Sequence, residues 1–136
     1  MRGFVYALLI IWQLPQTLVG LIMLPFLGSK RKVGGTDWTA VYECSGMRGG
    51  ISLGPLCFVS SSVARREAGI LHEIGHTRDS RLFGPLYLII IGIPSLLNAM
   101  FHFTKCYFDF YTEKRANKVS NLGVDEWCCL YVKGDE

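Results

Sequence analysis

The segment His72-Glu73-Ile74-Gly75-His76 has the pattern HExxH, with two histidines four residues apart. Residues four apart lie on one face of an α-helix, so both imidazoles can reach a single ion. Zinc suits such a pair because it binds histidine nitrogen at about 2.0–2.1 Å and has no geometric preference of its own. Glu73, beside the first histidine, is placed to take a proton from a water molecule at the metal. The pattern therefore predicts a site for one zinc ion, with Glu73 as the general base.

A catalytic zinc ion needs a third protein ligand and leaves its fourth position to water. The candidates for this third ligand lie downstream of the motif, and they are Asp79, His102, Asp109, Glu113 and Asp125. The longer pattern HExxHxxGxxH is excluded, because Asp79 and Leu82 stand where that pattern has glycine and histidine.

Glu113 has a distinctive context, because it begins the pattern ExxAN that ends at Asn117. Residues four apart on a helix share a face, so Glu113 can bind the ion while Asn117 accepts a hydrogen bond from a histidine ligand. Such a bond fixes the tautomer of the histidine. The alternative for Glu113 is a solvated helix charge that pairs with Lys114 or Arg115.

The order of HExxH, a hydrophobic segment and ExxA(D/N) resembles the gluzincin metallopeptidases, above all their integral-membrane branch with the heat-shock protease HtpX and the CaaX prenyl protease. The resemblance covers roughly residues 60–119, and Asn117 stands where that branch usually has aspartate. It implies a minimal membrane-bound zinc endopeptidase, with His72, His76 and Glu113 as ligands. It also implies that the substrate is a peptide or a membrane-protein segment, held along an edge strand that contains Ile51, Ser52, Leu53 and Gly54.

Two points stay open at the level of sequence. Peptide hydrolysis needs a donor for the oxyanion, and the candidates are His102, Tyr107, Tyr111 and Arg115, which their spacing does not rank. A different class of function is also open, namely a non-catalytic membrane anchor or interaction protein. In such a protein HExxH is incidental, or the metal site is structural and recruits a fourth ligand such as Cys57 or Cys106.

The elements that position these residues make an α+β fold. A helix is predicted over residues 63–80, which carries HExxH, and another over 107–120, which carries Glu113. Residues 36–45 and 51–60 are rich in β-formers and are separated by glycines, which predicts an antiparallel hairpin. Pro55 in the second run indicates an edge strand or a bulge.

Half of the 136 residues are hydrophobic and only 18% are charged, against about 25% in ordinary soluble domains. No charged side chain lies between Gly3 and Ser29, and the 25 residues from Phe4 to Gly28 predict a transmembrane helix kinked at Pro15. Gln13 and Gln16 are expected to face protein. The predicted organisation is an anchor over residues 1–29 and a metallopeptidase domain over 30–136.

The basic cluster Lys30-Arg31-Lys32 follows this span, which predicts that the active site lies on the cytoplasmic side of the membrane. The resemblance implies that this membrane is the bacterial inner membrane. A second apolar stretch, Leu82–Thr104, is interrupted by Gly92-Ile93-Pro94-Ser95. If it crossed the membrane once, Glu113 would lie on the opposite side from the two histidines. We therefore expect a membrane-embedded helical hairpin over residues 82–104 that turns at Gly92–Ser95.

The net charge and the cysteine content limit which partners and which cellular compartment are expected. The formal net charge is +3, and no basic run extends beyond residues 30–32, so no nucleic-acid partner is expected. The expected partners are the lipid bilayer and a peptide substrate, and the oligomeric state is open. Five cysteines without a CxxC pair predict reduced thiols in a domain that faces the cytosol.

Overall fold

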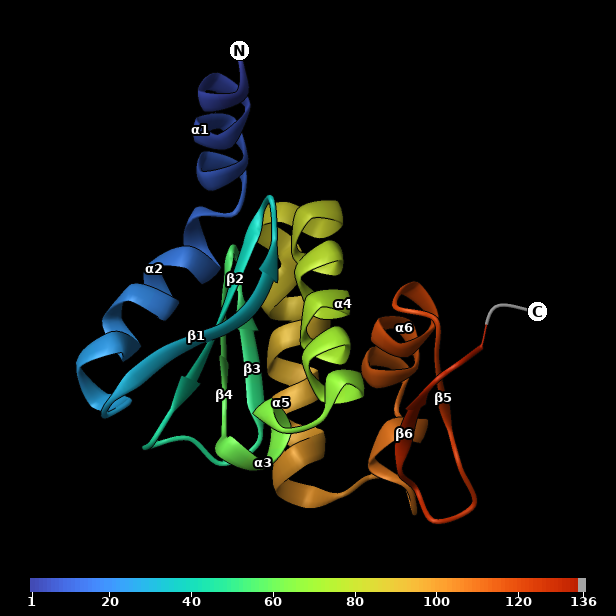
Figure 1. Cartoon of the computed structure of the whole chain (residues 1–136). Coiled ribbons are helices and arrows are strands. Elements are labelled where there is room, and N and C mark those ends of the chain that lie inside the picture. Colours follow the sequence, from blue (N-terminus) through green and yellow to red (C-terminus); the bar gives the residue numbers. More distant parts are fainter. Residues whose placement is uncertain (135–136) are drawn as a thin grey trace.

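A four-stranded sheet lies at the centre of the computed structural model, which describes residues 1–134 (Figure 1). The helix α2 covers one face of the sheet, α4 covers the other, and α6 packs along α4. The helices are α1 (Arg2–Trp12), α2 (Leu14–Met23), α3 (Ser61–Ala64), α4 (Glu67–Phe83), α5 (Ile93–Phe101) and α6 (Tyr111–Val119). The strands are β1 (Lys30–Thr36), β2 (Thr39–Cys44), β3 (Gly50–Leu53), β4 (Leu56–Val59), β5 (Leu122–Val124) and β6 (Leu130–Val132). The predicted α+β class is confirmed.

The side chains of β4 alternate between two cores, as successive residues of a strand must. Cys57 and Val59 face α4 and pack with Ile74 of that helix. Leu56 and Phe58 face the opposite way, toward the chain that follows α2. Both faces of the strand are therefore covered, which explains why its sequence is apolar throughout.

The sheet has the strand order β1-β2-β4-β3. Residues 51–60 form two strands instead of one, because Leu53 pairs with Leu56 across a tight turn that contains Pro55. The antiparallel pairing predicted between residues 36–45 and 51–60 is wrong, since β2 and β4 run parallel. The edge position predicted for residues 51–60 is confirmed only for β3, which pairs with β4 alone within the described chain, whereas β4 lies inside the sheet between β2 and β3.

The N-terminal apolar segment is broken at Gln13, with Pro15 in the first turn of α2. No single helix within residues 1–134 is long and apolar enough to cross a membrane; α1 and Leu14–Phe26 reach the required length and composition only together, and they are bent by 84°. The prediction of one kinked helix is thus wrong in its geometry. Gln13 and Gln16 are buried as expected, and both bond the Ser80 hydroxyl of α4.

The second apolar stretch reverses at Gly84, not at Gly92–Ser95 as predicted. Gly84 ends α4 with φ 52° and ψ −127°, a conformation that glycine adopts far more readily than other residues. The chain then runs in the opposite direction through a π-helical turn, Leu88–Gly92, that continues directly into α5, which contacts α6 (Figure 1). Pro94 lies in the first turn of α5, where its missing N–H is tolerated, so it does not turn the chain.

The two predicted helices that carry the motifs are present and in close contact. The helix with HExxH begins at Glu67, after a break at Arg65–Arg66, and the helix with Glu113 begins at Tyr111 after a short 3₁₀ turn. A side chain at Gly75 would lie 2.4 Å from the backbone oxygen of Ala116. Glycine at this position therefore lets α6 approach α4 closely enough for their side chains to meet.

The expectation of five reduced thiols is wrong for two of them. Cys106 and Cys128 form a disulfide with a Cα–Cα distance of 5.6 Å, which joins the segment before α6 to the β5–β6 hairpin. Cys44 and Cys57 are free and buried, and Cys129 is free and exposed. Sequence spacing did not indicate this pair, because 22 residues separate its members.

Maleimide labelling tests the pairing of the cysteines. We expect one rapidly modified thiol in the native protein without reductant, because Cys129 is the exposed free cysteine of the described chain. Unfolding without reductant should expose three thiols, and unfolding with reductant all five of the sequence. Mass spectrometry counts the adducts. Five adducts in unreduced, unfolded protein would show that Cys106 and Cys128 are not bonded.

Candidate metal centre

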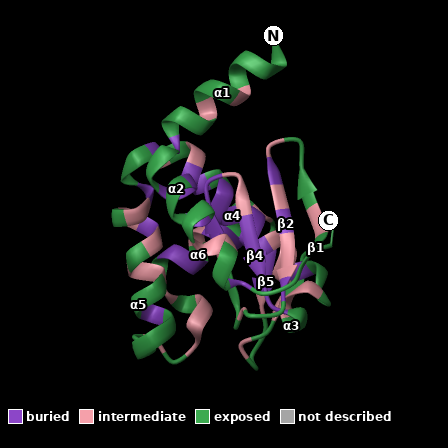
Figure 2. Ribbon diagram, turned by 90° about the vertical axis from the view of Figure 1, so that its left-hand side faces the viewer, coloured by how far each residue is buried: buried purple, intermediate pink, exposed green. Residues whose placement is uncertain are grey.

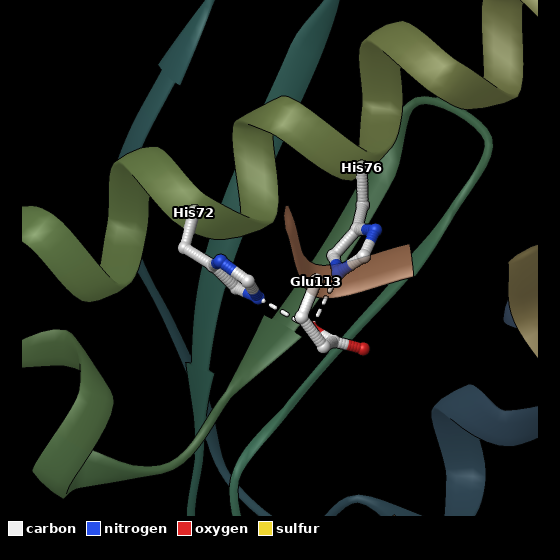
Figure 3. Close-up of side chains that lie close together, drawn as sticks. All are labelled: His72, His76 and Glu113. Atoms are coloured by element: carbon white, nitrogen blue, oxygen red, sulfur yellow. Dashed lines mark hydrogen bonds and ion pairs between the residues drawn. The ribbon is translucent and has the colours of Figure 1, made fainter. Parts of the chain in front are cut away.

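His72, His76 and Glu113 meet between α4 and α6 (Figure 3). The Nε2 atoms of His72 and His76 lie 2.8 and 3.1 Å from the same oxygen, Oε2 of Glu113. All three side chains are buried, and Glu113 has no exposed surface at all. Helix α4 aligns the two imidazoles because they are one turn apart, and α6 supplies the carboxylate from 37 residues further along the chain.

Asn117 determines which His72 nitrogen carries a proton. Its Oδ1 atom lies 2.7 Å from Nδ1 of His72, and a carbonyl oxygen can only accept, so Nδ1 is the donor. Nε2 of a neutral His72 is then an acceptor, and it faces a second acceptor, Oε2 of Glu113. Two buried acceptors at 2.8 Å need a proton or a metal ion between them.

The contact between the histidines and Glu113 also shifts the pKa values of His72 and Glu113. Burial by itself lowers the pKa of His72, but the hydrogen bond to Glu113 and the charges of Glu73 and Glu113 outweigh it, so the pKa is raised. Burial raises the pKa of Glu113, but hydrogen bonds and charge interactions with both histidines outweigh it and hold the pKa well below its usual range. The centre thus favours positive charge between its three ligand atoms.

The residues fit a metal ion. Bonds of about 2.0–2.2 Å in a tetrahedron place neighbouring ligand atoms about 3.3–3.6 Å apart. The two observed nitrogen–oxygen distances, 2.8 and 3.1 Å, are slightly shorter, so small side-chain shifts are enough to admit an ion. His72, His76 and Glu113 therefore form a buried group that can hold a metal ion.

The other four candidate ligands do not join this group. Asp79 is buried, but its carboxylate pairs with Arg115 at 2.8 Å. His102 and Asp109 are exposed, and Asp125 uses its carboxylate to accept backbone N–H groups in the loop before β6. Of the five residues that the sequence proposed as third ligand, Glu113 alone lies with the two histidines.

Glu73 is held by the edge strand. The hydroxyl of Ser52 lies 2.8 Å from Oε2 of Glu73 and 2.8 Å from its backbone oxygen, and it donates to one of them at a time. Glu73 is buried, but its side chain lines the same cavity as His76. A residue adjacent to a metal ligand therefore presents a carboxylate to the space beside the metal group.

That cavity has a volume of about 530 Å³ and is mostly apolar. Its walls come from β3, α2, α5 and the π-helical turn before α5, and Glu73, His76, Ser95 and Tyr107 supply polar groups. Ligand pockets usually have volumes of about 300–1,000 Å³. The cavity is therefore large enough for apolar side chains of a peptide beside the metal group.

The predicted substrate-binding residues lie along one wall of this cavity and in the turn after it. Ile51, Ser52 and Leu53 belong to β3, and all three line the cavity. Gly54 lies in the turn to β4 instead, where the cavity does not reach. The hydroxyl of Tyr87 donates to the backbone oxygen of Ser52 at 2.9 Å, so one group of this strand is already engaged.

The structure separates the four candidates for an oxyanion donor. Tyr107 lines the cavity, whereas the Tyr111 hydroxyl donates to Ile90 and Arg115 pairs with Asp79. His102 ends α5 in an exposed left-handed conformation. Burial and the nearby Glu113 carboxylate raise the pKa of Tyr107, so its hydroxyl keeps its proton and can donate.

Sequence reasoning missed two hydroxyl groups at the centre and the contact of a third. Ser95 and Thr112 both donate to Glu113 Oε1, whereas Ser52, predicted to line the substrate strand, contacts Glu73. One signal was present for Ser95, because it is a polar residue in the apolar stretch 88–97, and a polar group in such a segment requires a partner. Nothing in the sequence pattern singled out Thr112 or the contact between Ser52 and Glu73.

Comparison of the chain with family models, with curated proteins and with solved structures gave no match.

The pH dependence of stability tests the protonation of the centre. His72 has a raised pKa, so its contribution to folding is present below its ordinary value of 6.5 and is lost as the pH rises through the folded pKa. Glu113 has a lowered pKa, so its contribution is present above 4.5 and is lost as the pH falls. We expect urea unfolding of metal-free protein to give the highest unfolding free energy between these two values.

The variant Glu113→Gln is the control, because it removes the carboxylate and should flatten this profile on both sides. The unfolding free energy of metal-free protein should fall above this range, whereas the affinity for zinc should rise with pH, since a histidine must lose its proton to bind a metal. A wild-type unfolding free energy that rises steadily from pH 6 to about pH 9 in the absence of metal would contradict the assignment of the proton to His72.

Proposed function

We propose that this protein is a membrane-bound zinc endopeptidase. The observation that carries the proposal is the meeting of His72, His76 and Glu113 at one point, with Glu73 beside them on a cavity large enough for peptide side chains. Two imidazoles and one carboxylate are a ligand set typical of catalytic zinc, which keeps a further position for water or substrate. When bound, the ion polarises the scissile carbonyl and makes water more acidic.

The residues of the chain then have distinct tasks. Glu73, oriented by Ser52, accepts a proton from the attacking water and passes it to the leaving amine. Asn117 holds His72 in the tautomer that presents Nε2 to the metal group. Tyr107 is the candidate donor to the oxyanion, and β3 offers its unpaired edge to an extended peptide.

The contacts favour this role over a structural metal site, which is the alternative. A structural zinc site is closed by four protein ligands. The cysteines proposed as fourth ligand are engaged elsewhere: Cys57 Sγ lies by Ser52 and the Glu73 backbone, and Cys106 is in a disulfide. A structural site would also give Glu73 no task, although the fold orients its carboxylate with a hydroxyl.

Exposed apolar helices support attachment to a membrane. Figure 2 shows α1, α2 and α5 with mostly exposed residues, in contrast to the mostly buried strand β4. Large apolar side chains are exposed on α1 and α2 (Phe4, Leu8, Ile11, Leu18, Ile22) and on the segment through α5 (Leu86, Ile89, Ile93, Met100, Phe101). Water-exposed surface of this kind is unfavourable, so we propose that a bilayer covers it.

Two features predict opposite sides of the membrane for the metal centre. The basic cluster after Gly28 predicts the cytoplasm, whereas the Cys106–Cys128 disulfide is typical of oxidising compartments. We propose the oxidising side. The charge bias rests on three basic residues against Arg2, while the disulfide is a bond of the folded protein.

Replacement of the general base tests the catalytic proposal. In detergent-purified protein loaded with zinc, Glu73→Gln should reduce cleavage of a peptide library by roughly 10²–10⁴-fold, because proton transfer by a positioned group contributes about that much. Zinc content, measured by atomic emission, should stay at one ion per chain. Peptide products are counted by mass spectrometry.

The matched variant is Glu113→Ala, which should lose both zinc and cleavage because it removes a ligand. Full cleavage by Glu73→Gln, with zinc still bound, would show that the peptidase mechanism is wrong. A Glu113→Ala protein that binds zinc as tightly as wild type would remove Glu113 from the ligand set.

Flotation with liposomes tests the membrane proposal. Wild type should float with the vesicles, and Ile22→Asp with Ile89→Asp should weaken binding, since a buried acidic side chain costs about 2.5–3.5 kcal/mol in a bilayer. Thr36→Asp, a charge at an exposed position of β1, is the control and should bind as wild type does. If the double variant floats as well as wild type, these helices do not enter the bilayer.

The side of the membrane is tested through Cys129, which is exposed and free. A membrane-impermeant maleimide should label it in intact cells, because we place the disulfide region outside the cytoplasm. Cys129→Ser controls for other sites. Labelling only after lysis would favour the cytoplasmic placement predicted from the basic cluster.

A further inference from the structure

The apolar helix makes two hydrogen bonds with α6 at and just before Gly92–Ser95, the segment that interrupts the apolar stretch. The backbone oxygen of Ile90, in the π-helical turn directly before this segment, accepts a hydrogen bond from the hydroxyl of Tyr111 at 2.5 Å. Tyr111 is the first residue of α6, so this contact docks the start of α6 on the apolar segment.

Ser95 makes the second contact with α6, and this one reaches the metal centre. The hydroxyl of Ser95 donates to Oε1 of Glu113, and the hydroxyl of Thr112 lies 3.0 Å from the same atom. Oε2, the other oxygen of Glu113, faces the two histidines. The carboxylate is thus divided, with one oxygen bound by hydroxyls and the other directed to the metal position.

We propose that Ser95 is a positioning residue that makes Glu113 bind the metal through one oxygen only. The proposal rests on the metal site of the proposed function. A carboxylate without these hydroxyls can rotate and bring both oxygens to an ion, which occupies a position that water or substrate needs. Hydrogen-bonded partners of ligands fix ligand orientation in this way.

Ser95 differs from Thr112 in the element that carries it. Thr112 precedes Glu113 on α6 and moves with it, whereas Ser95 belongs to α5 and holds the carboxylate from outside its own helix. Ser95 also lines the cavity with Glu73 and His76. The apolar helix is therefore both a wall of the cavity and a support for the third ligand.

The test measures metal binding, not cleavage. Ser95→Ala should weaken zinc binding by about 10–100-fold in competition with a chelator, the usual effect of losing such a partner. With saturating Co²⁺ as a spectroscopic probe, Ser95→Ala should show weaker visible absorption than wild type, because the added oxygen raises the coordination number. Ser95→Thr keeps the hydroxyl and should restore both properties.

Tyr111→Phe is the matched control, because it removes the other hydrogen bond between the same two helices without touching Glu113. It should leave the Co²⁺ spectrum unchanged. Ser95→Val, which has the shape of threonine without its hydroxyl and brings no metal ligand, provides a second variant if Ser95→Ala does not fold.

The outcomes separate the two proposals. Wild type that binds neither zinc nor cobalt would overturn the metal site itself. Wild type that binds both ions, together with serine variants that keep its affinity and its spectrum, would overturn only the role of Ser95. The same spectral change in Tyr111→Phe would assign the effect to helix docking and also overturn it.

Discussion

The contact between Nε2 of His72 and Oε2 of Glu113, two hydrogen-bond acceptors in a buried space, is the constraint on which the centre depends. Because Nδ1 of His72 donates to Asn117, these two atoms, 2.8 Å apart, have no donor between them unless a proton or a metal ion supplies the positive charge. The fold holds them in place all the same, through Asn117 on one histidine and hydroxyl groups on the carboxylate. A protein that keeps such a cluster buried is organised around the positive charge that fills it.

The packing of the helices brings His72, His76 and Glu113 together. Gly75 lets α6 approach α4, and Gly84 reverses the chain, so that the apolar segment comes back to contact α6 through α5. The buried glutamines of the N-terminal segment bond Ser80 near the end of α4. The apolar segments are therefore integral to the centre, since α2 and α5 also form walls of the cavity beside it.

A disulfide-linked segment and several apolar helices surround the metal group and the cavity beside it. Cys106 lies directly before Tyr107 and Phe108, and the Phe108 ring contacts the ring of His72 with centroids 5.3 Å apart. The bond to Cys128 thus anchors the segment that covers one side of the metal group. Helices with exposed apolar faces lie around the opposite wall of the cavity.

The sequence by itself determined the pieces whose physics is local. The four-residue spacing of His72 and His76, and of Glu113 and Asn117, places each pair on one helical face whatever the rest of the chain does. The burial of Gln13 and Gln16 was also predictable, because an amide in an apolar segment needs a partner. Only the tertiary structure decided where the chain reverses, which strands run parallel, and that Ser95 supports Glu113 and Cys106 pairs with Cys128. These contacts join residues far apart in sequence, and they depend on how whole elements pack, which no local pattern encodes.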